Sequence, residues 1–160
     1  MRHDSLMAAS HIASLSRSIS GRILSPDEPG YDEHRRAWNT AADQRPAAIV
    51  LPDPDDVAAD VSSTLVAATE ADLRVAVQGT GHGATGLVDE SAILISMSHL
   101  RDVDIESGRA RVGAGARWSD VVGPAAGQGL AALAGSSADV GVVGYSLGGG
   151  IGWLARRYGL

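Results

Sequence analysis

The stretch Leu73-Arg74-Val75-Ala76-Val77-Gln78-Gly79-Thr80-Gly81-His82-Gly83 decides the fold, because an apolar segment runs directly into a glycine-rich loop. Residues 73–78 are predicted to form a strand. Glycine tolerates positive φ angles and lets the backbone approach a ligand closely, so N–H groups of residues 79–83 can converge on an anion. This loop is therefore the first candidate for a binding site.

Composition and charge limit the classes of partner. The chain has 160 residues, 44% of them hydrophobic, and a formal net charge of −6. Its length fits one globular domain. Every basic residue is an arginine and none lies in a long cluster, so we expect no nucleic-acid surface. A phosphate-bearing ligand would have to be held by backbone N–H groups, as in the glycine loop.

Several other classes of protein are excluded by what the sequence lacks. There is no cysteine, which rules out disulfides, thiolate metal sites and a cysteine nucleophile. The histidines outside the glycine loop are isolated, and we expect no metal site. The longest apolar runs, such as residues 47–51, are far shorter than the ~20 residues that cross a bilayer. Residues 1–23 lack the pattern of a secretory signal, so we expect a cytoplasmic protein that does not associate with membranes.

Apolar periodicity predicts the elements on both sides of the loop. Residues 1–31 are expected to form an arm that is poorly structured or helical. The expected strands are residues 47–51, 73–78 and 92–97, followed by a hairpin of residues 103–106 and 109–115. The expected helices are residues 56–69, 118–126 and 151–157, and Asp55 is the expected N-cap of the first helix. The first strand, the first helix and the second strand make a βαβ unit. The fold class is therefore α+β or mixed α/β.

Two glycine motifs allow alternative interpretations. Residues 81–86 match G-x-G-x-x-G, but a dinucleotide fold needs a helix directly after this motif, and a strand-like run follows instead. Residues 144–148 match G-x-S-x-G, in which Ser146 would be the nucleophile of an α/β-hydrolase-like serine hydrolase. No Asp, Glu or His follows Ser146 to complete a triad. The hydrolase stays an alternative to the interpretation below.

Five segments of the sequence occur in the order found in one enzyme family. They are residues 36–39, 45–50, 75–82, 110–115 and 140–153. Together they resemble the berberine-bridge-enzyme-like FAD-linked oxidoreductases, whose FAD-binding domain is of the vanillyl-alcohol-oxidase or PCMH type. The resemblance implies an α+β domain over residues 32–160, made of two small α/β subdomains, and FAD as the cofactor. It also implies hydride abstraction from an alcohol, sugar or C–H substrate, with the electrons passed to O₂ or another acceptor.

The resemblance assigns two loops to the cofactor. The first would hold the pyrophosphate and contains Gln78, Gly79, Thr80, Gly81, His82, Gly83 and Gly86. The second would line the isoalloxazine ring and the ribityl chain and contains Ser136, Ser137, Val140, Gly141, Gly144, Tyr145, Gly148, Gly149 and Gly150. Tyr145 is equally well explained by structural packing.

His82 matches the histidine that many relatives bond to the 8α-methyl carbon of the flavin. A neutral imidazole is a competent nucleophile near pH 7. The alternative is a histidine that only makes hydrogen bonds within a glycine turn. Ser137 stands where some relatives place a second, cysteinyl link, so double attachment is excluded. Trp38, Trp118 and Trp153 are expected to anchor the core.

Family members are much longer and add a substrate domain and a returning C-terminal segment, which completes the FAD site and supplies the catalytic base. The resemblance therefore implies an FAD-binding domain that is truncated at its C-terminal end, which would bind a small-molecule substrate only in a full-length form. It assigns no catalytic residue and no particular substrate. A non-catalytic fragment is a further alternative.

Overall fold

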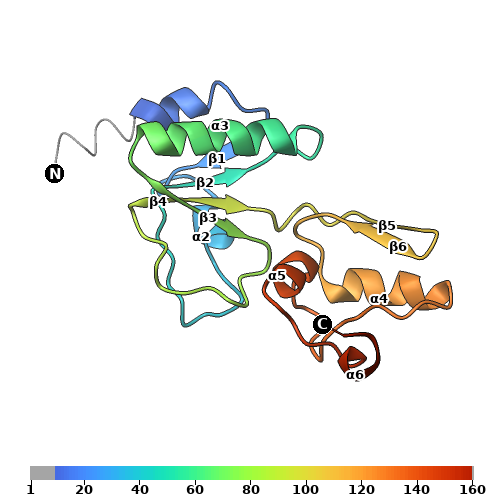
Figure 1. The fold of residues 1–160 in the computed structure, drawn as a ribbon. Helices are drawn as coiled ribbons and strands as arrows, with labels where there is room; N and C mark the ends of the chain where they lie inside the picture. The colour runs from blue at the N-terminus through green and yellow to red at the C-terminus, as the bar shows by residue number, and fades with distance from the viewer. Residues whose placement is uncertain (1–9, 160) are drawn as a thin grey trace. The chain divides into compact units, whose positions relative to one another are not determined.

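The computed structural model describes residues 10–159 (Figure 1). The chain forms two compact units, which are divided in the sequence between Met97 and Ser98. Each unit has its own sheet and its own buried apolar cluster. Residues 1–9, which belong to the expected arm, lie outside the described part of the chain.

The first unit is built on a four-stranded sheet with the order β1-β2-β4-β3. Strand β1 (Arg22–Leu24) is antiparallel to β2 (Ala48–Leu51), whereas β4 (Ala92–Ser96) is parallel to both β2 and β3 (Arg74–Gln78). β2 and β4 are buried at every position. Burial on both faces explains their uninterrupted apolar sequences. The strands expected at residues 47–51, 73–78 and 92–97 are confirmed, each within one residue.

Helices cover the sheet of the first unit (Figure 1). Helix α3 (Val57–Glu70) connects β2 to β3 and packs against β3 and β4. The short helix α2 (Tyr31–His34) inserts Tyr31 into a buried cluster with apolar side chains of β1, β2 and β4. The expected βαβ unit forms, but β4 lies between its two strands. A strand later in the sequence therefore pairs with both β2 and β3.

Helix α3 begins one residue later than the sequence predicts. Its N-cap is Asp56, so the assignment of Asp55 as the cap is wrong. The physical reason is a turn at Asp53, whose side-chain Oδ1 accepts a hydrogen bond from the N–H of Asp55 and whose carbonyl accepts one from Asp56. Asp55, which the sequence pattern predicts as the N-cap, is therefore part of the turn that Asp53 forms before the helix.

The second unit contains a two-stranded sheet and three helices in the order β5, β6, α4, α5 and α6. Strands β5 (Val103–Glu106) and β6 (Arg109–Val112) form the expected hairpin. Its turn residues, Ser107 and Gly108, have φ angles of 52° and 75°. Two positive φ angles are characteristic of the type I′ turn that suits a two-residue hairpin loop. Strand β6 ends three residues before the predicted limit.

Helix α4 (Trp118–Gly127) confirms the helix expected at residues 118–126 and packs its buried face against the hairpin. Trp118, Val121 and Val142 form the buried cluster of this unit. Two short helices follow: α5 (Val142–Leu147) and α6 (Ala155–Tyr158). The helix predicted over residues 151–157 is wrong in its first four residues, and α5 was not predicted. Across residues 10–159, no helix combines the length and the apolar character required to span a membrane.

Candidate cofactor site

The glycine loop of the first unit follows strand β3 without an intervening helix. Residues 79–91 consist of turns and bends until β4 begins at Ala92. The helix that a Rossmann fingerprint requires after residues 81–86 is therefore missing from the place where it would stand. This confirms the prediction that the G-x-G-x-x-G match is not a dinucleotide fingerprint.

The carbonyl groups of the loop are held by a neighbouring segment. Thr80 O accepts a hydrogen bond from the N–H of Trp38 at 3.0 Å, and Gly81 O accepts one from the N–H of Asn39 at 3.3 Å. In a trans peptide group, the N–H points in the direction opposite to the C=O of the preceding residue. The N–H groups of Gly81 and His82 consequently face away from residues 38 and 39. Adjacent backbone N–H groups that point the same way are the feature that phosphate-binding loops use.

Gly81 is the position in this loop that requires glycine. Its φ is +77°, and a Cβ atom there would lie 2.8 Å from the Cα of Ala37 and 2.8 Å from the side-chain oxygen of Gln78. Gly83 and Gly86 have no atom within 4 Å of such a Cβ position. The loop thus packs tightly against protein at Gly81 and is open at Gly83 and Gly86, where a ligand can approach.

Gln78 supports the loop with its side chain. It is 7% exposed, and its Oε1 accepts a hydrogen bond of 2.7 Å from Gln44 Nε2. Its own Nε2 donates to the carbonyl of Arg36 at 3.3 Å. These contacts tie the end of β3 to the segment that also binds the loop carbonyls. The assignment of Gln78 to the cofactor stays a prediction, and its amide has a positioning role within the protein.

His82 stacks on Trp38. The ring centroids are 3.8 Å apart and the ring planes differ by 17°. Trp38 is 57% exposed, so the expectation that it anchors the core is wrong. Trp153 is also exposed, whereas Trp118 is buried as expected. The sequence could not show the stack, because Trp38 and His82 lie far apart in the chain and meet through the folded loop.

The second predicted loop, residues 136–150, is bound to the start of α4. The carbonyls of Ala138 and Val140 accept hydrogen bonds from the N–H groups of Ser119 and Trp118, at 2.7 and 3.0 Å. Ser137 donates from Oγ to Asp139 Oδ1 at 2.6 Å. Backbone pairing of Arg117 with Gly141 continues the attachment. These contacts fix the backbone that the family resemblance assigns to the flavin.

Tyr145 is packed against protein on several sides. Its ring makes an edge contact with Trp118, with centroids 5.4 Å apart and planes at 90°. A Cβ atom at Gly150 would lie 2.5 Å from the Tyr145 ring, and one at Gly135 would lie 3.0 Å from it. Glycine at these two positions therefore makes room for the tyrosine. The contacts favour structural packing of Tyr145.

The G-x-S-x-G motif has the wrong local structure for a nucleophile elbow. Residues 144–147 lie inside helix α5, and Ser146 is exposed on it. A nucleophile elbow places its serine on a sharp turn between a strand and a helix. The geometry of the hydrolase alternative is not present at Ser146.

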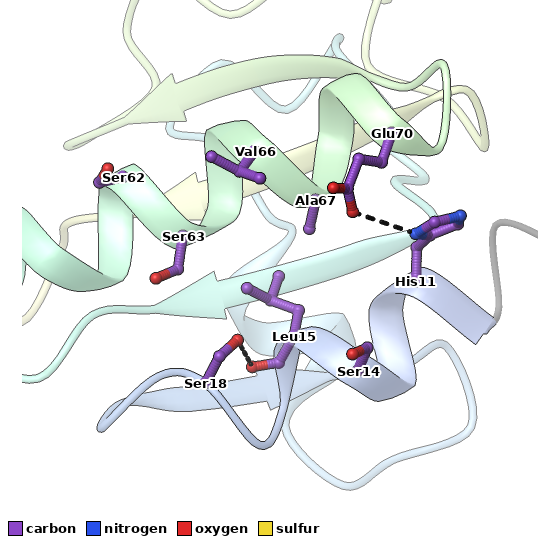
Figure 2. Close-up of a pocket in the computed structure, with 9 residues that line it drawn as sticks. All are labelled: His11, Ser14, Leu15, Ser18, Ser62, Ser63, Val66, Ala67 and Glu70. Atoms are coloured by element: carbon purple, nitrogen blue, oxygen red, sulfur yellow. Dashed lines mark hydrogen bonds and ion pairs between the residues drawn. The ribbon is translucent and has the colours of Figure 1, made fainter.

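A cavity lies in each of the two units. The cavity in the second unit, of about 510 Å³, includes Ser136 in its wall. Figure 2 shows the one in the first unit, of about 280 Å³, between the helical residues 10–15 and α3. Its wall includes the pair His11 Nδ1 and Glu70 Oε2, which are 3.4 Å apart. None of the predicted cofactor residues lines this cavity of the first unit.

Comparison with known proteins identifies the family. The family described as FAD binding domain matches residues 46–160, and the chain belongs to it. (R)-6-hydroxynicotine oxidase of Paenarthrobacter nicotinovorans is 33% identical over 146 residues, which are 89% of this chain and 31% of that enzyme. FAD is therefore the cofactor of this domain.

Solved structures agree with this assignment. BBE-like 1 of Physcomitrella patens has a TM-score of 0.78 and 26% identity over 94% of this chain and 33% of its own. Glucooligosaccharide oxidase of Acremonium strictum, described with a 6-S-cysteinyl, 8α-N1-histidyl FAD, has a TM-score of 0.76 and 27% identity over 94% of this chain and 32% of its own. The predicted α+β fold of the PCMH-type FAD-binding domain is confirmed. The chain spans about a third of the length of these relatives.

Proposed function

We propose that this domain serves a flavin-dependent oxidoreductase that abstracts hydride from an alcohol, sugar or C–H substrate. O₂ or another acceptor would take up the electrons. Membership of the FAD-binding family supports the proposal, as do the oxidase and oxidoreductase relatives. The observation that carries it is the loop at residues 79–83, whose Gly81 and His82 N–H groups are turned away from the protein segment that binds its carbonyls.

Backbone groups would hold the phosphates of FAD. The net charge of −6 leaves no general positive surface for them. The N–H groups of Gly81 and His82 supply donors without a charged side chain, and the open position at Gly83 permits close approach. Residues 136–141 and the glycines 144 and 148–150 would accommodate the flavin and the ribityl chain. FAD, when bound, supplies the hydride-accepting chemistry.

His82 is the proposed point of covalent attachment. Its Nε2 atom is buried, so Nδ1 is the ring nitrogen that would form the bond. Attachment at His82 would replace one C–H bond of the flavin 8α-methyl group and the imidazole N–H by a C–N bond. The two hydrogens leave as two protons and two electrons, with O₂ as the acceptor and hydrogen peroxide as the product. Ser137 occupies the position of the second link, and its hydroxyl is hydrogen-bonded to Asp139, so one link is proposed.

The full activity requires parts that the matched region of the relatives does not include. The substrate is proposed to be a small molecule, and the catalytic base is expected outside the matched third. The cytoplasmic location rests on the short apolar runs of residues 1–23 and stays a prediction.

Flavin content tests the proposal directly. The purified chain is incubated with FAD and desalted, and its visible spectrum is recorded before and after acid precipitation. We expect flavin absorption bands in the native protein and in the precipitate. His82→Ala is the matched control, and it should bind FAD but release it all into the acid supernatant. A colourless wild-type protein contradicts FAD binding by this chain, and precipitable flavin in His82→Ala contradicts attachment at residue 82.

A further inference from the structure

We propose that Trp38 is a positioning residue, which holds the imidazole of His82 in the orientation needed for attachment to FAD. The inference rests on the covalent link proposed above. The stack of the two rings, with centroids 3.8 Å apart and planes 17° from parallel, carries it. Both residues lie in the first unit, so the pair exists independently of the second unit.

The exposure of Trp38 indicates a role other than core packing. A tryptophan side chain is large and apolar, and burial is its usual environment. Here the residue is 57% exposed, while the neighbouring Ala37 is 3% exposed. The indole ring contacts the face of a histidine at the predicted cofactor loop.

The backbone places Trp38 in register with His82. The Trp38 N–H donates to Thr80 O at 3.0 Å, two residues before His82. Asn39 donates from its backbone to Gly81 O at 3.3 Å and, on the other side of His82, from Nδ2 to Ala84 O at 3.1 Å. Three hydrogen bonds thus join residues 38 and 39 to the residues that flank His82. A shift of either segment would separate the rings.

Stacking restricts the torsions that aim the imidazole. A histidine side chain has two rotatable bonds, and the second has a broad, roughly two-fold preference. A parallel indole face fixes the plane of the ring, and the burial of Nε2 fixes which edge faces the protein. The remaining nitrogen, Nδ1, is then presented in one direction. Holding a nucleophile in a reactive orientation raises its rate of reaction without a new chemical group.

The rate of flavin attachment is the measurement that separates positioning from simple binding. The purified chain, without bound flavin, is incubated with FAD in air, and acid-precipitable flavin is followed over time. Trp38→Leu removes the aromatic face and should slow attachment by about tenfold or more. Trp38→Phe keeps an aromatic face and should restore most of the rate. Trp153→Leu, at an exposed tryptophan of the second unit, is the matched control and should attach flavin at the wild-type rate.

Affinity for FAD is measured separately in the His82→Ala background, where no bond forms. Adding Trp38→Leu there should change the dissociation constant by less than about twofold, because the residue is proposed to act on His82 alone. An equal loss of affinity and attachment rate would make Trp38 a binding contact and overturn the inference. Attachment at the wild-type rate in Trp38→Leu would also overturn it.

The stack is also measurable without flavin. In NMR spectra of the flavin-free chain, the ring protons of His82 should be shifted upfield by the indole, and Trp38→Leu should abolish this shift. An unchanged His82 spectrum in Trp38→Leu contradicts the stack. A wild-type chain that shows the shift but never forms acid-stable flavin contradicts the covalent function itself, which distinguishes that failure from a failure of positioning.

Discussion

The carboxylate of Asp60 accepts a hydrogen bond from the backbone N–H of Gly21, with 2.9 Å between Oδ2 and N. It also accepts bonds of 2.8 Å from the N–H groups of Ser20 and Asp53. Asp60 is 1% exposed, and a Cβ at Gly21 would lie 2.8 Å from its Oδ2. One side chain of α3 therefore ties down the residues that enter β1 and those that leave β2.

Asp60→Asn should destabilise the first unit by roughly 2–4 kcal/mol, because at this buried position the amide nitrogen places a donor where a backbone N–H group needs an acceptor. Urea unfolding followed by far-UV circular dichroism measures the change. Asp72→Asn is the control, since Asp72 is exposed and has a φ of 53°, which asparagine tolerates well. The control should stay within about 0.5 kcal/mol of wild type. An Asp60→Asn protein as stable as Asp72→Asn would show that the three bonds add no net stability.

Gly81→Ala and Gly83→Ala should separate stability from cofactor binding. At Gly81, the positive φ and the contact with Ala37 predict a loss of about 1–3 kcal/mol in unfolding free energy, together with weaker FAD binding. At Gly83, the open surroundings predict unchanged stability but weaker FAD binding, since the added methyl group would face the ligand. Thermal unfolding and titration with FAD measure the two properties. Unchanged FAD affinity in Gly83→Ala would place the cofactor away from this glycine.

Acid should weaken the second unit through Asp120. Hydrogen bonds from the Arg101 guanidinium, at 3.0 and 2.5 Å, lower the pKa of the Asp120 carboxyl, and the N–H of Arg117 contributes in the same direction. A lowered pKa in the folded state means that the carboxylate stabilises the fold above the unfolded pKa, near 3.9 for Asp, and that this contribution is lost as the pH falls through the lower folded value.

Asp120→Asn should therefore cost about 1 kcal/mol at pH 7 and less at pH 3. Urea unfolding monitored by the fluorescence of the buried Trp118 measures the difference at both pH values. Asp102→Asn serves as the reference variant, because Asp102 is exposed. An equal cost of Asp120→Asn at both pH values would contradict the role of the carboxylate charge.

Ser146→Ala should leave FAD binding and stability unchanged, because the hydroxyl lies on the exposed side of helix α5. With a p-nitrophenyl ester as substrate, the wild-type chain and the variant should both show only the background rate of hydrolysis. Wild-type hydrolysis that the substitution abolishes would restore the serine hydrolase alternative.

Local sequence patterns predicted the central elements well. The runs of β2 and β4 are apolar at every position because both faces of these strands are buried, and α3 repeats its apolar residues at helical spacing. The hairpin of β5 and β6 was predicted from two strand-like runs separated by two residues, of which Gly108 readily adopts the positive φ found there. Each of these sequence patterns lies within, or a few residues from, the strand, helix or turn that it predicts.

The remaining features depend on long-range contacts or lack a periodic signal. Helix α5 contains Gly144 and runs into Gly148, and glycine is a poor helix former, so propensity argues against the helix that forms there. β1 is three residues long and gains its place by pairing with β2. The stack of Trp38 on His82 and the role of Gln78 arise from pairings between distant segments, which no local pattern contains.

The strand order of the first unit has a consequence for the order in which its parts can assemble during synthesis. β2 and β3 do not pair with each other, because both pair with β4. When the nascent chain has emerged only as far as the glycine loop, β2 and β3 are present but β4, with which both pair, has not yet been made. The loop cannot be anchored at the end of a finished sheet until residues 92–96 have left the ribosome. We therefore expect the glycine loop to take its final place beside β4 only after residues 92–96 have been synthesised.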